Sequence, residues 1–163
     1  MDYNKLEQID TFIFDVDGVL TNSLMHITES GELLRQMNVR DGAAMKFALE
    51  KGYKICIITK GNSKGVKIRL ETLGAHPVLD QVEDKKIAFS ILVNDFGINP
   101  ITSLYMGDDR ADLVVFDLVK LSCAPHDGCT EVIKKAEFVS PKNGGEGCVR
   151  DIIERVLRVR GDW

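Results

Sequence analysis

Two aspartates separated by a single residue follow a short apolar run near the start of the chain. Asp15 and Asp17 come directly after Thr11–Phe14, and Gly18 comes next. If the apolar run is a buried strand, both carboxylates can converge on one site where the strand opens into a loop. Gly18 would let the backbone turn tightly and bring its N–H groups close to a ligand. The motif indicates a ligand site, although an acidic turn after a strand would use the same residues.

A second group of acids follows another apolar run, Thr102–Met106. Asp108, Asp109 and Asp112 are three acids within five residues, and they repel one another unless they are solvated, cap a helix or hold a cation. Asp109 could cap a helix that starts near Arg110, and Asp112 could favour its first turn, which would explain one or two of the three. Together with the first acid pair they form an oxygen-rich set suited to a hard cation. Mg²⁺ is the commonest such ion where phosphate chemistry is done.

Residues of the opposite polarity follow other apolar runs. Thr59 and Lys60 come after Tyr53–Ile58, and Lys85 opens the helix expected after Asp84. A lysine at a helix start is unfavourable with respect to the helix dipole and needs a compensating anion. Each lysine alone is simply explained as a solvated surface group. An acid pair, a threonine, a lysine and an acid cluster at separate strand ends are hard to obtain by chance, and they predict one shared site.

The elements that must position these side chains are predicted from hydrophobic periodicity. Short runs that are apolar on both faces suit the strands of a parallel sheet covered on both sides. The predicted strands are Thr11–Phe14, Tyr53–Ile58, His76–Leu79, Thr102–Met106 and Lys120–Cys123.

Helices are predicted between the strands from their capping residues. They begin at Asp41, at Asn62 or Ser63, and at Asp84, and they end at Gly52, Gly74 and Gly97. The Asp84 helix carries an apolar stripe of Ala88, Leu92 and Phe96, and the last helix carries one of Val149, Ile152, Ile153, Val156 and Leu157.

One segment breaks the alternation of strands and helices. Within Leu24–Val39, two extended stretches flank the turn-like Glu29–Glu32, which predicts a β-hairpin flap over about residues 22–39. The remaining order predicts an α/β fold, a three-layer Rossmann-like parallel sheet with an inserted β-hairpin, in one domain spanning residues 1–163. Ligands in such folds bind at the carboxyl ends of the strands.

Composition limits the classes of function. The 163 residues include 21 Lys and Arg against 25 Asp and Glu, with a net charge of -4, so no basic field is available to attract nucleic acid. No apolar run approaches the length of a membrane span, and no signal segment follows Met1, so we expect a cytoplasmic protein without membrane contacts. The four cysteines form no C-x-x-C pair, so neither disulfides nor structural zinc are expected.

The motifs in this order resemble those of the haloacid dehalogenase superfamily of phosphohydrolases. They are DVDGV at Asp15–Val19, Thr59 after IIT, Lys85, and GDDRAD at Gly107–Asp112. The hairpin in place of a cap domain, NVRDG at Asn38–Gly42 and NGGEGCVRD at Asn143–Asp151 resemble one branch. That branch comprises the 3-deoxy-D-manno-octulosonate 8-phosphate (Kdo-8-phosphate) phosphatases and their nine-carbon keto-acid relatives.

The resemblance implies an Mg²⁺-dependent phosphomonoester hydrolase of lipopolysaccharide biosynthesis. Asp15 would be the nucleophile that forms an aspartyl-phosphate, and Asp17 the general acid and base. Asp15, the Asp17 carbonyl and Asp108 would ligate Mg²⁺, with Asp109 or Asp112 in support. Thr59 and Lys85 would hold the phosphoryl oxygens.

Substrate contacts and assembly are also implied only by the resemblance. The predicted substrate contacts are Gly18, Lys60, Arg40, Asp41 and Arg69, and each of the charged ones could instead lie on the surface or, for Asp41, cap a helix. The family forms homotetramers in which hairpins pack together, and Asn143–Arg150 would close a neighbour's site, unless it is only a glycine turn before the last helix. Kdo-type relatives usually read Thr-Gly-Arg where this chain has Thr59-Lys60-Gly61, so the arginine is absent here.

Other readings stay open at this point. The substrate could be a nine-carbon, sialic-acid type 9-phosphate. The chain could instead be a non-catalytic scaffold or a phospho-accepting regulatory domain, although receiver domains place the phosphorylated aspartate after the third strand, where this chain has Leu79-Asp80-Gln81.

Overall fold

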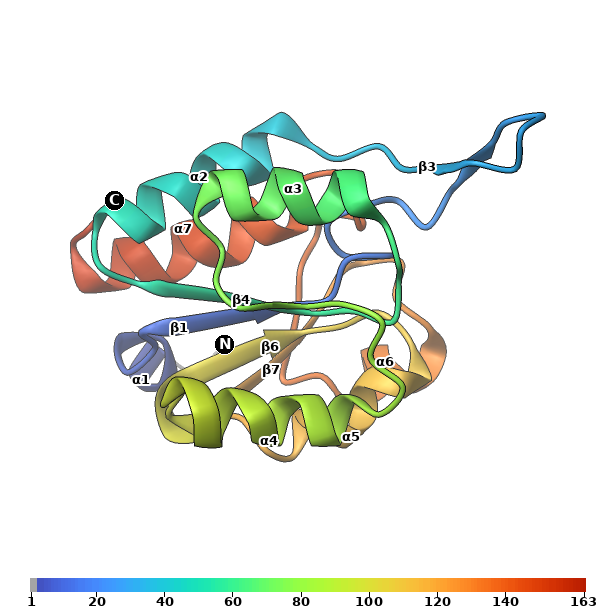
Figure 1. Ribbon diagram of the computed structural model, residues 1–163. Coiled ribbons are helices and arrows are strands. Elements are labelled where there is room, and N and C mark those ends of the chain that lie inside the picture. The colour runs from blue at the N-terminus through green and yellow to red at the C-terminus, as the bar shows by residue number, and fades with distance from the viewer. Residues whose placement is uncertain (1–2) are drawn as a thin grey trace.

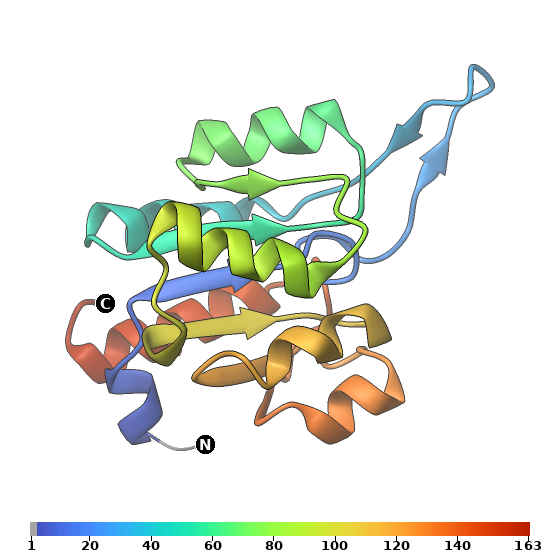
Figure 2. The same cartoon turned by 60° about the horizontal axis from the view of Figure 1, so that its bottom comes forward.

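A computed structural model describes residues 3–163, and Figures 1 and 2 show its ribbon in two orientations. The strands are β1 (Thr11–Phe14), β2 (His26–Ile27), β3 (Leu33–Leu34), β4 (Lys54–Ile58), β5 (Val78–Leu79), β6 (Ser103–Met106), β7 (Leu121–Ala124) and β8 (Phe138–Val139). The α-helices are α1 (Tyr3–Glu7), α2 (Val39–Glu50), α3 (Lys64–Leu73), α4 (Lys85–Phe96), α5 (Leu113–Phe116), α6 (Thr130–Lys135) and α7 (Cys148–Arg160).

A parallel sheet lies at the centre of the molecule, with the strand order β5-β4-β1-β6-β7-β8. Its side chains alternate between two apolar layers. Phe12 and Phe14 pack with α1, α2, α3 and α7, whereas Ile13 on the other face packs with α4, α5 and α6. Figure 1 shows these helix layers above and below the sheet. The predicted three-layer α/β architecture is thus confirmed.

The predicted hairpin is also present. β2 and β3 pair antiparallel, with His26 opposite Leu34 and Ile27 opposite Leu33, and the hairpin projects away from the sheet and its helices (Figures 1 and 2). The two short strands β2 and β3 form a sheet of their own, which does not pair with the central sheet.

Several predicted boundaries need correction. The N-cap of α2 is Asn38, whose side chain accepts the N–H of Arg40, so Asp41 does not cap this helix. Ser63 caps α3 and Asp84 caps α4, as expected. Phe96 is 39% exposed and packs edge-on against the ring of His76 at 5.5 Å, so it does not complete the predicted stripe.

Three elements were not predicted, and one strand is shorter than predicted. α1, α6 and β8 are short, with two to six residues each, so they carry little periodicity. The third strand spans only Val78–Leu79 of the predicted His76–Leu79, although the N–H of His76 also donates to the carbonyl of Ile55 at 2.8 Å. The apolar stripe predicted for α7 is fully buried.

Candidate active site

The site begins where β1 and β6 end side by side. The two strands run parallel in register, with Phe14 opposite Met106, so the loops that follow them start together. The N–H of Asp15 donates to the carbonyl of Met106 at 3.1 Å, which continues the ladder by one residue. The predicted meeting of the acid pair with the acid cluster therefore follows from strand adjacency.

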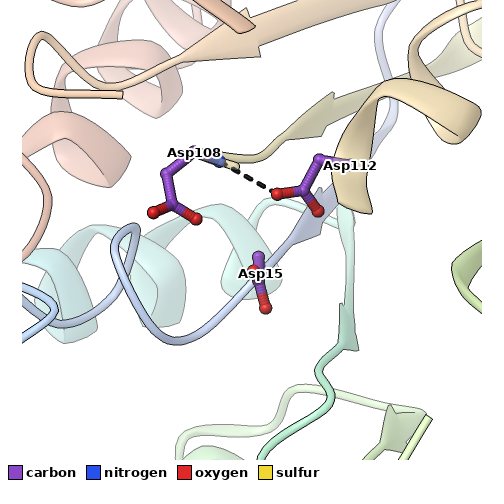
Figure 3. Close-up of side chains that lie close together, drawn as sticks. All are labelled: Asp15, Asp108 and Asp112. Carbon is purple, nitrogen blue, oxygen red and sulfur yellow. Dashed lines mark hydrogen bonds between the residues drawn. The ribbon is translucent and has the colours of Figure 1, made fainter. Parts of the chain in front are cut away.

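Three carboxylates meet at this edge (Figure 3). Asp15, Asp108 and Asp112 each offer an oxygen, and these oxygens all lie within 4.8 Å of one another. Burial raises the pKa of Asp15 to about 6 against the opposing charge of Lys85, and burial together with the charges of Asp15 and Asp112 raises the pKa of Asp108 to about 7. Ionising these buried carboxyl groups is unfavourable, and a bound divalent cation would offset that cost while taking their oxygens as ligands.

Glycine makes this approach possible. Gly18 has a φ of +88°, and a Cβ on it would lie 1.9 Å from a carboxylate oxygen of Asp108. A Cβ on Gly107 would likewise lie 2.2 Å from the carboxyl carbon of Asp112. Gly18 therefore shapes the loop around Asp108, and its N–H donates to Oγ1 of Thr21 at 3.3 Å; its contact with substrate stays a prediction.

Lys85 lies between two of the acids. Its Nζ is 2.7 Å from Oδ2 of Asp15 and 2.6 Å from Oδ1 of Asp112, and only 3% of its side chain is exposed. Burial alone would lower the pKa of Lys85, but the two carboxylates overcome it and raise that pKa. The anion required by a lysine at a helix start is thus supplied by the acid cluster.

Asp112 is held from every side. Its Oδ1 accepts bonds from Lys85 and from the hydroxyl of Tyr105 at 2.5 Å, and its Oδ2 accepts the N–H groups of Asp108 and Asp109, each at 3.1 Å. With both oxygens engaged, Asp112 orients the loop and the lysine. Asp15 and Asp108 keep the freer oxygens. Tyr105 was not predicted, because a tyrosine within a buried strand gives no sign that its hydroxyl reaches a carboxylate.

Asp109 has the structural role that the sequence allowed. Its carboxylate accepts the N–H of Arg110 at 2.8 Å and caps the 3₁₀ turn Arg110–Asp112, while Asp112 bonds back to its N–H. Its side chain lines the rim of the acid site without joining the three-carboxylate cluster.

A hollow of about 230 Å³ opens beside these acids. Its lining includes Asp15, Asp17, Thr59, Lys60 and Lys85, so the structure brings together the predicted nucleophile, acid and cations. Thr59 is buried and its Oγ1 accepts the N–H of Gly61 at 3.1 Å.

Asp17 is paired with a residue that sequence reasoning missed. The guanidinium of Arg35 donates from Nε to Oδ1 of Asp17 at 2.7 Å and from Nη2 to Oδ2 at 3.0 Å. Arg35 directly follows β3, so the hairpin reaches into the site through this side chain. Nothing in the local sequence distinguishes Arg35 from the other arginines, because its importance depends on how the hairpin folds back.

Three predicted substrate contacts lie elsewhere. Arg40 lines a separate hollow with Lys142 and Arg150, and Arg69 lies against Gly42. Asp41 is 1% exposed and its Oδ1 accepts the N–H of Arg150 at 2.8 Å, so it holds the start of α7.

Burial raises the pKa of Asp41 to about 6, and its Oδ2 has no hydrogen-bond partner in the part of the chain that the structure describes. Within this chain Arg40, Asp41 and Arg69 do not line the hollow beside the acids, and their contact with substrate stays a prediction.

The glycine-rich segment lies against the loop that follows β1. Gly145 donates its N–H to the carbonyl of Val19 at 2.9 Å, and a Cβ on Gly144 would lie 1.9 Å from the carbonyl oxygen of Gly18. Cys148 is the first residue of α7, and its thiol donates to the carbonyl of Val19 at 3.3 Å. Within Asn143–Arg150 these residues therefore support the loop that follows β1 in their own chain, and closure of a neighbour's site by this segment stays a prediction.

Comparisons with known proteins agree with this geometry. Residues 75–152 match the family model described as haloacid dehalogenase-like hydrolase. The chain is 38% identical over 157 residues, 96% of its length and 84% of the relative's, to the 3-deoxy-D-manno-octulosonate 8-phosphate phosphatase KdsC of Escherichia coli K12.

Solved structures show the same likeness. A phosphatase of that name from Yersinia pestis superposes with a TM-score of 0.95 at 31% identity, covering 98% of this chain and 86% of that one. The Moraxella catarrhalis phosphatase, solved in complex with a magnesium ion, a phosphate ion and a KDO molecule, gives a TM-score of 0.93 at 28% identity, covering 98% and 91% of the two chains.

Proposed function

Because this chain belongs to the haloacid dehalogenase-like hydrolase family, together with Kdo-8-phosphate phosphatases, we propose that it is an Mg²⁺-dependent phosphomonoester hydrolase acting on Kdo-8-phosphate. The observation that carries this proposal is the meeting of Asp15, Asp108 and Asp112 with Lys85 at one edge of the sheet. It is a site with oxygen ligands for a cation and a lysine for the phosphoryl group.

The donor set fits magnesium. Asp15 and Asp108 present carboxylate oxygens that Asp112 and Lys85 do not fully occupy, and hard oxygens are what Mg²⁺ prefers. We propose that these two side chains and the carbonyl of Asp17 hold the ion. When bound, Mg²⁺ would neutralise phosphate charge and keep Asp15 ionised.

Asp15 is the proposed nucleophile. Its oxygen attacks phosphorus in line, forming an O–P bond to the carboxylate as the bond from phosphorus to the sugar oxygen breaks. Lys85 lies 2.7 Å from Asp15, within reach of the transferring oxygens, and the Thr59 hydroxyl lines the same hollow. Both would stabilise the charge that spreads over the phosphoryl group in the transition state.

Asp17 is the proposed acid and base. It gives its proton to the departing sugar oxygen, and it then takes a proton from the water that attacks the aspartyl-phosphate and releases inorganic phosphate. Its side chain is 38% exposed, so both the leaving group and water can reach it from the hollow.

We propose an assembly for this enzyme as well. The hairpin exposes Leu24, Ile27, Leu33 and Leu34 to between 48% and 73%, which is costly in water for a projecting element. Packing of hairpins in a homotetramer would cover these side chains and complete the substrate site. Each chain of the assembly would be a single domain over residues 1–163. Light scattering at micromolar concentration tests this proposal: a monomeric mass contradicts it.

We infer the cellular location of the protein from its cysteines. The four cysteines are free, as in proteins of a reducing compartment, which supports a cytoplasmic enzyme serving lipopolysaccharide biosynthesis. Among residues 3–163 there is no helix long and apolar enough to cross a bilayer.

A substrate screen tests the proposed activity. Phosphate release with Mg²⁺ is measured for Kdo-8-phosphate, a nine-carbon sugar-acid 9-phosphate and simple sugar phosphates, and kcat/KM values are compared. We expect Kdo-8-phosphate to lead. A preference for the nine-carbon acid would place the chain with the nine-carbon keto-acid phosphatases instead. Similar kcat/KM values for all substrates would indicate a phosphatase of broad specificity. If no phosphomonoester is hydrolysed, the non-catalytic scaffold becomes the better interpretation.

A further inference from the structure

Arg35 is the guanidinium that lies nearest the catalytic acid. Of its side chain only 7% is exposed, whereas neighbouring Leu33 and Leu34 on the hairpin are about half exposed. It packs into a narrow space that it shares with Asp17, Thr59 and Gly61, three residues that also line the hollow beside the acids. The side chain therefore links the hairpin to the chemistry.

The position of Gly61 gives the guanidinium its room. A Cβ on residue 61 would lie 3.5 Å from Nη2 of Arg35 and 3.3 Å from Oδ2 of Asp17. A longer side chain there would occupy the space in which these two groups pair. The absence of a side chain at position 61 and the presence of Arg35 are thus complementary.

The other cations of the site are poorly suited to receive a carboxylate. Lys85 is already held between Asp15 and Asp112, and Lys60 on the rim is a single-point ammonium without a planar fork. Arg40 and Arg69 do not line the hollow. Arg35 alone among these has a guanidinium beside the reacting groups, and it already shows the bidentate geometry of carboxylate recognition.

We propose that Arg35 is the specificity residue that binds the substrate's carboxylate, and that Asp17 occupies it until substrate arrives. A substrate carboxylate offers the same two acceptors as Asp17, so the guanidinium exchanges one partner for another at little cost. The exchange frees both oxygens of Asp17, so that one of them can take up from water the proton that it then gives to the leaving group. A phosphate ester without a carboxylate leaves Asp17 engaged.

This inference rests on the proposed function, and one experiment separates the two. The kcat/KM values for Kdo-8-phosphate, which carries a carboxylate, and for glucose 6-phosphate, which does not, are measured for wild type, Arg35→Gln and Arg35→Lys. Arg158→Gln is the control, since Arg158 is an exposed arginine of α7, 61% accessible and distant in sequence from the site. Thermal unfolding verifies that each variant is folded.

We expect Arg35→Gln to lower the ratio of the two kcat/KM values, acid over neutral substrate, by roughly ten- to a hundredfold, the range for losing a charged hydrogen-bond pair. Arg35→Lys should fall between, and Arg158→Gln should keep the wild-type ratio. An equal loss with both substrates would overturn the inference, because it would mean that Arg35 acts only by orienting Asp17.

Binding provides an arm that does not depend on turnover. The Kd for Kdo-8-phosphate is measured by calorimetry in the Asp15→Asn protein, with and without Arg35→Gln. A Kd that rises at least tenfold supports the inference even if no phosphoester is hydrolysed and the proposed function fails. An unchanged Kd overturns it even if the enzyme is an active phosphatase.

Discussion

The buried acids at the ends of β1 and β6 and the hairpin that follows β1 are held in opposite ways. Asp15, Lys85 and Asp112 are buried and bound to one another, to Tyr105 and to backbone N–H groups. The hairpin has two residue pairs of ladder, an exposed apolar surface, and Arg35 as its ion pair to the body. The proposed catalytic groups are thus positioned by the core of one chain, whereas Arg35, the proposed specificity residue, belongs to an element that this chain leaves uncovered.

The largest expected effect tests the buried side of this comparison. Asp15→Asn should lower kcat by on the order of 10⁴-fold or more, since it removes the nucleophile. It should leave the fold intact at neutral pH, because burial disfavours the charge that it removes. Phosphate release and urea unfolding measure the two effects. Near wild-type turnover in a clean preparation would assign the nucleophile elsewhere.

Removing the cation between the acids should cost stability. Lys85→Met leaves Asp15 and Asp112 buried without a counter-charge, and breaking a buried pair in this way costs about 3–5 kcal/mol. Urea unfolding at pH 7.5 measures the loss. Lys60→Met, an exposed lysine on the same rim, is the matched control and should change the unfolding free energy by less than about 0.5 kcal/mol. A similar small change for Lys85 would mean that the cluster is less rigid than its hydrogen bonds indicate.

Magnesium and pH should act together on stability. Burial raises the pKa of Asp15 to about 6 and that of Asp108 to about 7, and protonated carboxyls do not bind the ion. The gain in unfolding free energy from Mg²⁺, about 2.7 kcal/mol at a hundredfold excess over Kd, should therefore be present at pH 8 and shrink toward pH 6. Thermal shifts at both pH values measure it, with Asp108→Asn as the variant that should lose the shift.

Without metal the pH dependence reverses. Folded Asp15 and Asp108 keep protons that the unfolded chain, with an aspartate pKa of 3.8, releases. The contribution of these two carboxyl groups to the unfolding free energy is fully present below pH 3.8 and is lost as the pH rises through 6 to 7. A metal-free protein that became more stable over this range would contradict the raised pKa values.

The smallest effect concerns the hairpin. The double variant Ile27→Ser with Leu33→Ser changes two opposed side chains that are 73% and 48% exposed. Because neither side chain is buried in its own chain, each substitution should change the unfolding free energy of an isolated chain by no more than about 0.5 kcal/mol. The double variant should nevertheless have a lower mass by light scattering, because the hairpins would no longer pack together. A loss of stability well above this at unchanged mass would show that the hairpin packs on its own chain.

Much of the fold and the reactive residues could be predicted from the sequence. Buried parallel strands are continuous apolar runs, and the residues that follow them must gather at one edge, so Asp15, Thr59 and Asp108 could be assigned to one site. The caps Ser63 and Asp84 were readable because capping is a local interaction. These features depend on neighbours within a few residues or on strand order.

What only the tertiary structure decided involves contacts between distant segments. Asp41 looked like a cap or a substrate contact and instead holds the start of α7, more than a hundred residues later. Gly144 and Gly145, predicted to close a neighbour's site or to form a glycine turn, lie against Gly18 and Thr21 of their own chain. Arg35 gave no signal in the sequence, and the fold of the hairpin brings it to Asp17. The sequence by itself determined which groups could react, because strand periodicity and motif order are local; which charges meet was decided by packing, because such pairs are separated along the chain and close only in three dimensions.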